Sequence, residues 1–270
     1  MVKLADSNHT TLSIIDNRRF EADMRPYLGG SQIGKCPRFV WYSFRWCFTE
    51  MLANRIYRLF NRGHREEEIF IENLQYAGIH VYGEQKEITF AYGHGRGHID
   101  GLGTNVREAH KSVHLLEFKT MNSKYFRQTK AEGVKKAKPE YFDQCQIYMS
   151  KLNNVERTLF CAVNKDDDEY YIERLKLDKH HADLLERKAE AIVLSEYPPN
   201  RIKEDPTWYE CKFCPAANVC HHGQPPNPTC RICVNMGIEN DGWWSCGYHG
   251  IYLATEQQKL MCDQFQLQEM

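Results

Sequence analysis

The chain has 270 residues, a formal net charge of −1 and 42% hydrophobic residues. This composition is typical of a globular protein with a substantial core and excludes a disordered or fibrous one. The charge balance excludes a globally basic nucleic-acid binder, so any contact with DNA must depend on a local patch. No apolar run approaches the roughly 18 residues of a membrane span, and the N-terminal residues lack the apolar core of a secretory signal. We therefore expect a cytoplasmic protein with no membrane partner.

The pattern of apolar residues and breakers predicts a series of helices and strands. Residues 1–30 are polar and are expected to form a loosely packed lead-in. Pro37 suits a helix start, and a helix over 39–60 is expected to be interrupted at Gly63. The remaining expected elements are a helix over 64–77, strands over 80–90 and 98–102 around a Gly-rich turn at 93–97, a strand over 113–119, a helix over 139–151, strands over 158–163 and 170–177, and a helix over 178–195 with Asp178 at its cap.

This order of elements predicts an α/β fold in which helices flank a mixed central sheet. After Pro198 and Pro199, hydrophobic periodicity disappears and Pro, Cys, His and Trp dominate. Such a tail needs something besides a core to hold it, and a bound metal is the obvious candidate. We therefore expect an N-terminal helical segment, an α/β core and a Cys-rich, metal-binding C-terminal tail.

The chain contains 11 cysteines, and six of them lie between Cys211 and Cys246. An odd number without a visible export signal argues against a disulfide scaffold. Close pairs of cysteines in a cytoplasmic chain indicate metal ligands instead. The three cysteines that lie in expected helices and strands, Cys47, Cys145 and Cys161, are most simply small core residues.

Charged residues end two of the expected strands. Asp100 follows one strand, and Glu117 and Lys119 lie two residues apart on another, so they share a face while Phe118 packs on the opposite one. The two carboxylates could hold Mg²⁺ or Mn²⁺, and Lys119 could orient a water or balance the charge of a phosphate. The alternative is an exposed strand end with one salt bridge.

Two further pairs lie at helical spacing. His64 and Glu67 are one turn apart on an apolar stripe, where polar groups need a partner such as a metal or its water. Glu66 and Glu68 flank Glu67, which leaves the choice of glutamate open. Gln144 and Tyr148 are four residues apart and can reach one target.

Together these motifs, Gly-His-x-x-Glu, Gly-x-x-Asp, Glu-x-Lys and Gln-x-x-x-Tyr, resemble the RecB-like branch of the PD-(D/E)XK nuclease superfamily over roughly residues 31–220. The resemblance implies a restriction-endonuclease-like core. It also implies metal binding by His64, Asp100, Glu117 and the main-chain carbonyl of Phe118, with Glu67 as a further candidate, and a catalytic role for Lys119. Gln144 and Tyr148 would contact DNA or the lysine. Ile99 stands before Asp100, where the name of the superfamily has proline.

Three cysteines, Cys211, Cys214 and Cys220, leave one ligand position open, and Cys36 is well placed to fill it. The pattern resembles the iron–sulfur nucleases: CRISPR-associated RecB-like exonucleases, AddB-type nuclease domains and related phage exonucleases. The resemblance implies one 4Fe-4S cluster that joins the two ends of the nuclease like a staple. A four-cysteine zinc site is the alternative.

Beyond that region, Cys230, Cys233, Cys246 and His249 have the spacing of a zinc knuckle or ribbon. We expect an accessory zinc module that extends a DNA track or binds a partner, with His221, His222 and Cys262 as alternative ligands. The expected divisions are residues 1–62, which supply one cluster cysteine, a nuclease core over 63–197, a cluster-binding segment over 198–222 and the zinc module over 223–270.

A basic stretch follows the Glu-x-Lys motif and is expected to guide DNA past the metal site, since lysines attract phosphates. Its alternative is a solvated surface. The candidate DNA-binding residues are Lys124, Arg127, Lys130, Lys135, Lys136 and Lys138.

We expect a metal-dependent DNA exonuclease. The resemblance implies single-stranded ends as substrate and 5′ to 3′ polarity. It also implies a role in recombination, repair or spacer acquisition, with a protein of such a pathway as partner and phage origin plausible. The first alternative is a catalytically silent DNA-binding adaptor with structural metal clusters. The second is a zinc-and-iron redox or regulatory protein.

Overall fold

The computed structural model describes residues 11–16, 24–50 and 52–269. Much of the lead-in expected over residues 1–30 therefore lies outside the described residues. Within it, α1 (Thr11–Asp16) is a short helix.

The first long helical region of the sequence is divided at a different place from the predicted one. α2 (Pro37–Phe44) and α3 (Asn54–Tyr76) are separate helices, so the predicted helix over 39–60 is wrong. α3 passes straight through Gly63, where a Cβ would meet nothing within 4 Å. A glycine on an open helix face costs only about 1 kcal/mol, too little to end a long helix.

The break after α2 comes from its C-terminal turn. Trp46 adopts a left-handed conformation with φ of 58°, and the Cys47 N–H donates to the Tyr42 carbonyl at 2.9 Å. This closes the helix in the manner of a C-terminal cap. Trp46 is itself only 2% exposed, so burial of its ring stabilises an otherwise unfavourable backbone.

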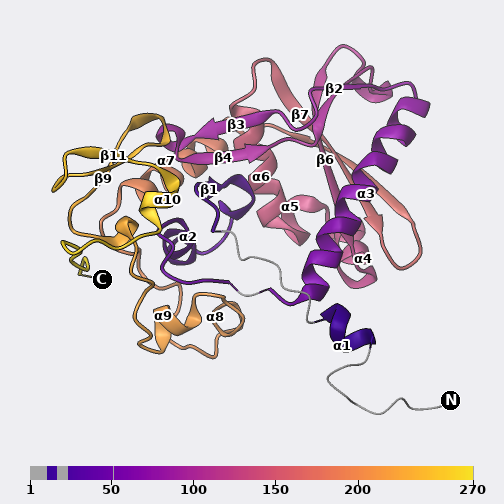
Figure 1. Cartoon of the computed structure of the whole chain (residues 1–270). Helices are drawn as coiled ribbons and strands as arrows, with labels where there is room; N and C mark the ends of the chain where they lie inside the picture. The colour runs from indigo at the N-terminus through magenta and orange to yellow at the C-terminus, as the bar shows by residue number, and fades with distance from the viewer. Residues whose placement is uncertain (1–10, 17–23, 51, 270) are drawn as a thin grey trace, which may run out of the picture.

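Five strands form the central sheet in the order β2–β5–β6–β7–β8 (Figure 1). β6 and β7 run parallel, whereas the other neighbouring pairs are antiparallel. The predicted fold class, a mixed central sheet flanked by helices, is confirmed. The strands are β2 (His80–Tyr82), β5 (Gly101–Thr104), β6 (Val113–Met121), β7 (Val155–Asn164) and β8 (Tyr170–Lys176).

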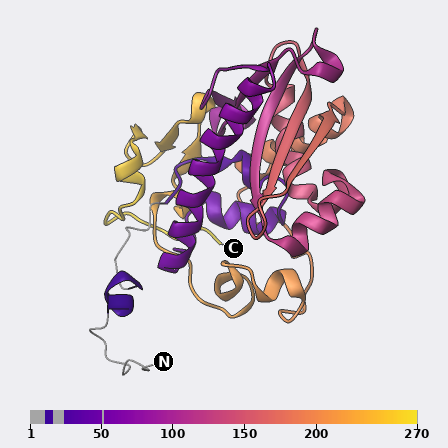
Figure 2. The ribbon, with the colours of Figure 1, turned by 90° about the vertical axis from the view of Figure 1, so that its right-hand side faces the viewer.

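Helices cover both faces of this sheet. α3 lies along one face (Figure 2), where Phe70 and Leu74 pack with Leu116 of β6. The other face is covered by helices of the β6–β7 crossover, and α7 packs against α6 and α2. The cap residue of α7, Asp178, accepts a hydrogen bond from the His181 N–H at 3.1 Å. These helices are α4 (Ser123–Glu132), α5 (Val134–Ala137), α6 (Pro139–Ser150) and α7 (Lys179–Leu194). The basic stretch therefore forms two helices of the crossover.

The segment predicted as one strand over 80–90 is divided between two sheets. β2 belongs to the central sheet, whereas β3 pairs with β4 in a small sheet of order β1–β4–β3. Gly83 and Gln85 lie between β2 and β3 and have positive φ values of 65° and 55°. These left-handed conformations turn the chain from one sheet to the other. The expected Gly-rich turn at 93–97 is in part a strand. The strands of this sheet are β1 (Leu28–Gly29), β3 (Glu87–Phe90) and β4 (Gly95–His98).

The Cys-rich C-terminal part lies beside α2, away from α3 (Figure 1). Trp244 is 1% exposed and joins the main hydrophobic core, with its ring centroid 5.1 Å from that of Phe44. The elements here are α8 (Tyr209–Lys212), α9 (Ala217–His221), α10 (Thr255–Gln258) and the antiparallel strands β9 (Met236–Ile238), β10 (Trp244–Cys246) and β11 (Ile251–Leu253).

Short 3₁₀ helices complete the chain: η1 (Gly30–Gln32), η2 (Ala91–Gly93), η3 (Arg107–Ala109), η4 (Cys230–Ile232) and η5 (Asn240–Gly242). Among the described stretches, no helix combines the length and apolar character needed to cross a bilayer.

Gly93 and Gly63 form a matched pair for testing this packing. A Cβ on Gly93, where φ is 81°, would lie 2.7 Å from the Asp241 carbonyl carbon. Gly93→Ala should therefore lower the free energy of unfolding by about 1–3 kcal/mol. Gly63→Ala should raise it by up to about 1 kcal/mol, because alanine favours helix and meets no neighbour. Urea denaturation measures both, and equal effects would contradict the docking of η5 on η2.

Candidate active site

Glu117 and Lys119 lie near the end of β6 and form an ion pair with each other. The Glu117 side chain is 1% exposed and that of Lys119 is 21% exposed. Phe118 points to the other face, where its ring stacks on Phe70 with the centroids 5.1 Å apart. The alternation of a strand thus places two charged groups on the face that carries the crossover helices and anchors the residue between them against α3.

Asp100 reaches the same place from the neighbouring strand. It lies between β4 and β5, and β5 pairs with β6 so that Gly101 is opposite Leu116. The Asp100 Oδ2 atom accepts a hydrogen bond from the Phe118 N–H at 2.6 Å. The antiparallel register therefore fixes the Asp100 carboxylate beside that of Glu117.

The electrostatics of this group favour a cation. Burial raises the pKa of Glu117 to about 7, the Lys119 ammonium opposes the rise and the Asp100 carboxylate adds to it. The Glu117 Oε2 atom is buried and has no hydrogen-bond partner in the described part of the chain. Two carboxylates face one ammonium, and a buried oxygen without a partner is costly. A divalent cation with oxygen ligands fits this set of donors.

α3 contributes a third carboxylate. Glu67 Oε1 lies 3.6 Å from His64 Nδ1, and the pKa of Glu67 is raised by burial and by the negative charge of Asp100. Glu66 instead lies 3.8 Å from Arg62, and Glu68 is exposed. Of the three neighbouring glutamates, Glu67 is thus the one beside the carboxylates. The His64 side chain is 74% exposed and lies at the mouth of the site.

A cleft of about 710 Å³ opens over these groups. Six of the candidate residues from the sequence line it: His64, Glu66, Glu67, Phe118, Lys119 and Gln144. Asp100 and Glu117 are not among its lining residues. Others at its wall were not candidates in the sequence: Arg25, Ser31, Phe60, Tyr141 and Lys165.

Lys165 could have been found from the topology. It directly follows β7, which runs parallel to β6 with Asn164 opposite Met121. Parallel strands end at the same edge of a sheet, so a residue after β7 lies near the end of the Glu-x-Lys strand. Arg62 of α3 holds this loop by donating to the Lys165 carbonyl at 2.9 Å. Arg25 precedes β1, and nothing in its local sequence distinguishes it.

Tyr148 lies beneath the cleft and is not among the residues that line it. Its side chain is 3% exposed and packs closely on Gly30 and Gly97, where an added Cβ would overlap the ring. Burial raises the pKa of Tyr148, and the charge of Glu117 raises it further. Its neighbour at four residues' distance, Gln144, does reach the cleft.

The six basic residues predicted to bind DNA do not line the cleft itself. Lys130 pairs with Glu169, and Lys136 lies 3.6 Å from Glu132. Lys138 Nζ lies 3.5 Å from Glu140 Oε1, so these three lysines are partly neutralised.

Lys138 is the member of this group that adjoins the site. Its Nζ lies 3.7 Å from the ring centroid of Tyr125 and 5.6 Å from that of Tyr141. Lys119 also faces Tyr141, at 5.4 Å. The Tyr141 ring therefore lies between the catalytic candidate Lys119 and the basic helices.

The four cysteines proposed to share a cluster line one small cavity of about 30 Å³. Cys36 caps α2, whereas Cys211, Cys214 and Cys220 come from the segment around α8 and α9. Arg201 donates to the Cys220 carbonyl at 2.6 Å and holds the last of them.

The cysteines of the expected zinc module line a different cavity, together with His249 and Cys262. His221, named as an alternative ligand, lines the cavity of the other group instead. In the conformation described for residues 11–16, 24–50 and 52–269, no three His, Cys, Asp or Glu side chains are grouped closely enough to hold a metal ion. Metal binding at any of these sites would therefore require its ligands to move closer together.

Comparisons with known proteins give the following. No protein-family model matches the chain, and no curated protein matches it. Among solved structures, an alkaline exonuclease (LHK-Exo) from Laribacter hongkongensis is similar at 18% identity, with a TM-score of 0.44 over 63% of this chain and 87% of that one. The same protein with dAMP gives a TM-score of 0.45 at 18% identity, over 62% and 86%. The crystal structure of SSO0001 is similar at 19% identity, with a TM-score of 0.43 over 74% of this chain and 88% of that one.

The arrangement of carboxylates predicts a measurable metal site. Mn²⁺ should bind the wild-type protein and raise its free energy of unfolding, by about 2.7 kcal/mol at 100 times the dissociation constant. Glu117→Gln should lose most of this effect because it removes a buried ligand charge. Glu68→Gln, on the exposed side of α3, should retain it. Denaturation with and without Mn²⁺ measures the difference, and equal stabilisation of both variants would contradict the assignment.

Proposed function

We propose that the protein is a metal-dependent deoxyribonuclease that hydrolyses phosphodiester bonds at the cleft between α3 and the end of β6. One observation carries the proposal: the buried Glu117 carboxylate, with one oxygen lacking a partner, beside Asp100 and Lys119. A buried excess of negative charge is costly unless a cation compensates it. Its ion-pair partner Lys119 lines a large cleft, as does Glu67, which favours a catalytic role over a purely structural one.

Each residue of the site has a role in this proposal. Asp100 and Glu117 hold the cation, with His64, Glu67 and the Phe118 carbonyl as further ligands. Mg²⁺ or Mn²⁺ supplies an activated water and neutralises charge on the phosphate. Lys119 leaves its ion pair with Glu117 and orients the attacking water or balances the charge of the phosphate. Gln144 contacts the DNA or Lys119 from the wall, and Tyr148 supports the site from below.

The DNA is proposed to enter along the crossover helices. Lys138, Tyr125 and Tyr141 form a continuous line of cation and aromatic contacts that leads to Lys119. Aromatic faces stack on unpaired bases, and lysines attract phosphates. Arg25 and Lys165 place positive charge on other parts of the cleft wall. This lining supports single-stranded DNA as a substrate.

Finer points of the proposal rest on the resemblance to the iron–sulfur nucleases. They are action at DNA ends, 5′ to 3′ polarity and a role in recombination, repair or spacer acquisition with a partner from such a pathway. A phage origin and a cytoplasmic location belong to the same proposal.

Cleavage of end-labelled single- and double-stranded DNA tests the activity. The wild-type protein should release label with Mg²⁺ or Mn²⁺ and not with EDTA. Lys119→Ala should reduce the rate at least 10²-fold, because it removes a charge that acts in the transition state, while DNA binding is largely retained. Lys179→Ala is the matched control, since Lys179 is 78% exposed, lies beside Glu156 and belongs to no part of the proposed site. Intact protein that binds DNA without cleaving it would instead support the adaptor.

We further propose that Cys36, Cys211, Cys214 and Cys220 hold a 4Fe-4S cluster. Their position around one cavity supports a shared group, and the resemblance favours iron–sulfur over zinc. Ligation would tie the start of α2 to a segment about 180 residues later and so close a very long loop.

Elemental and sulfide analysis tests the cluster. Cys214→Ser should lose iron and sulfide and lower the midpoint of thermal unfolding, since the segment around α8 and α9 has few buried side chains. Cys161→Ala, in the separate core cluster beneath α3, should keep its iron. Zinc in place of iron in the wild-type protein would support the alternative ligation, and a fully folded Cys214→Ser variant with unchanged metal would contradict both.

A further inference from the structure

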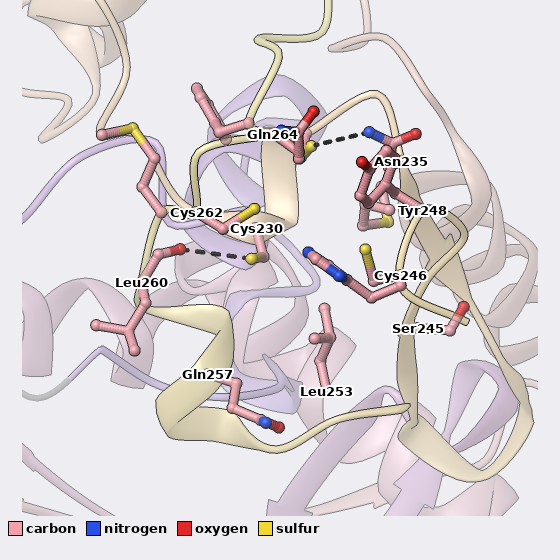
Figure 3. Close-up of a pocket in the computed structure, with 15 residues that line it drawn as sticks. Cys230, Asn235, Ser245, Cys246, Tyr248, Leu253, Gln257, Leu260, Cys262 and Gln264 are labelled. Carbon is pink, nitrogen blue, oxygen red and sulfur yellow. Dashed lines mark hydrogen bonds between the residues drawn. The ribbon is translucent and has the colours of Figure 1, made fainter. Parts of the chain in front are cut away.

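A second group of cysteines surrounds a cavity of about 230 Å³ in the C-terminal part of the chain (Figure 3). Cys230 and Cys233 come from η4 and the residue that follows it, and Cys246 ends β10. Cys262 lies beyond α10, in a stretch without regular structure. His249 lines the cavity as well. Five potential ligands therefore line the cavity, whereas a structural zinc ion binds four.

We propose that Cys230, Cys233, Cys246 and Cys262 form a four-thiolate zinc site, and that His249 is not a ligand. The inference does not depend on the nuclease activity. It replaces the ligand set expected from the spacing in the sequence, in which His249 completed the site. Zinc suits this group because it accepts four thiolates in a tetrahedral site.

The contacts of Cys230 favour Cys262 as a partner. The Cys230 Sγ atom donates to the Leu260 carbonyl at 3.4 Å, two residues before Cys262. The labelled side chains of Cys230 and Cys262 lie next to each other at one side of the cavity (Figure 3).

The chain around Cys262 is also attached to the loop that carries the first two cysteines. The Val234 N–H donates to the Gln266 carbonyl and the Gln268 N–H to the Ile232 carbonyl, both at 2.9 Å. Cys233 and Leu267 form an antiparallel bridge. This backbone pairing delivers Cys262 to the same side of the cavity in a fixed register.

Apolar burial alone does not hold this segment. Leu260 and Met261 are 65% and 58% exposed, and Cys262 is exposed as well. A segment with so little core needs another source of stability, and a metal ligand supplies it. His249 is also exposed and lies in a turn, where it packs edge-on against Tyr248 with the ring centroids 5.0 Å apart.

The proposed site has a structural consequence, because Arg231 lies between two of its ligands. Its guanidinium is buried, lies 3.6 Å from the Trp46 ring centroid and donates to the Phe44 and Pro26 carbonyls, both at 2.6 Å. Zinc would therefore fix the loop that inserts this cation into the main core. Pro26 adjoins Arg25 of the cleft wall, so the site stabilises the approach to the cleft as well.

Zinc content of the full-length protein tests the proposal. Cys262→Ser should lose one equivalent of zinc relative to the wild type and unfold at lower temperature. His249→Ala should retain that zinc, and its cobalt-substituted form should keep the thiolate-to-metal absorption of the wild type. Loss of zinc in His249→Ala with retention in Cys262→Ser would overturn the ligand set.

Alkylation of the wild-type protein gives a test that does not depend on the folding of a variant. Zinc-replete protein treated with iodoacetamide should show Cys262 protected by peptide mass spectrometry, although this residue is exposed. A zinc chelator should remove the protection. Equal labelling of Cys262 before and after chelation, or wild-type protein purified without zinc, would overturn the proposal.

Discussion

Burying the Glu117 carboxylate near the end of β6 in its charged form costs free energy unless nearby positive charge offsets it. Lys119 supplies part of that charge, but Asp100 adds a second carboxylate that is fixed by the Phe118 N–H. The surrounding elements serve to hold this group. β5 brings Asp100 into register, α3 covers the opposite face and contributes Glu67, and α6 closes the wall with Tyr141 and Gln144.

The two cysteine-lined cavities lie outside the carboxylate site, where segments near both ends of the described chain meet the core. Cys36 and the cysteines around α8 and α9 line one cavity, and the four of the C-terminal part line another. Between them, Arg231 and Trp244 enter the aromatic core next to α2. Packing of the Arg231 cation and the Trp244 ring on Phe44 therefore holds the C-terminal part against α2. The proposed metals would fix the loops that this packing leaves exposed.

The sequence predicted the central features of the fold because they depend on local patterns. The period of a strand placed Glu117 and Lys119 on one face, and Asp178 caps its helix as expected. The helix boundary near α2 was wrong because the buried ring of Trp46 outweighs its unfavourable φ. The strand predicted over 80–90 was wrong because the turn at Gly83 sends its two halves to different sheets.

The cleft residues that the sequence did not identify are brought to the site by tertiary contacts. Arg25 reaches the cleft only because β1 pairs with β4, a contact between segments more than 60 residues apart. Lys165 follows from the parallel pairing of β6 and β7, which the order of elements alone does not specify. Cys262 was only an alternative ligand in the sequence, because spacing counts residues along the chain and does not show the backbone pairing of residues 266–268 that brings it to the cavity, which His249 lines as well.

Anomalous diffraction from crystals grown with Mn²⁺ would test the central claim most directly. The account predicts a manganese peak within about 2–2.3 Å of carboxylate oxygens from both Asp100 and Glu117, with Lys119 released from its ion pair. A map in which manganese is absent from the cleft while Glu117 and Lys119 remain paired at saturating Mn²⁺ would contradict it.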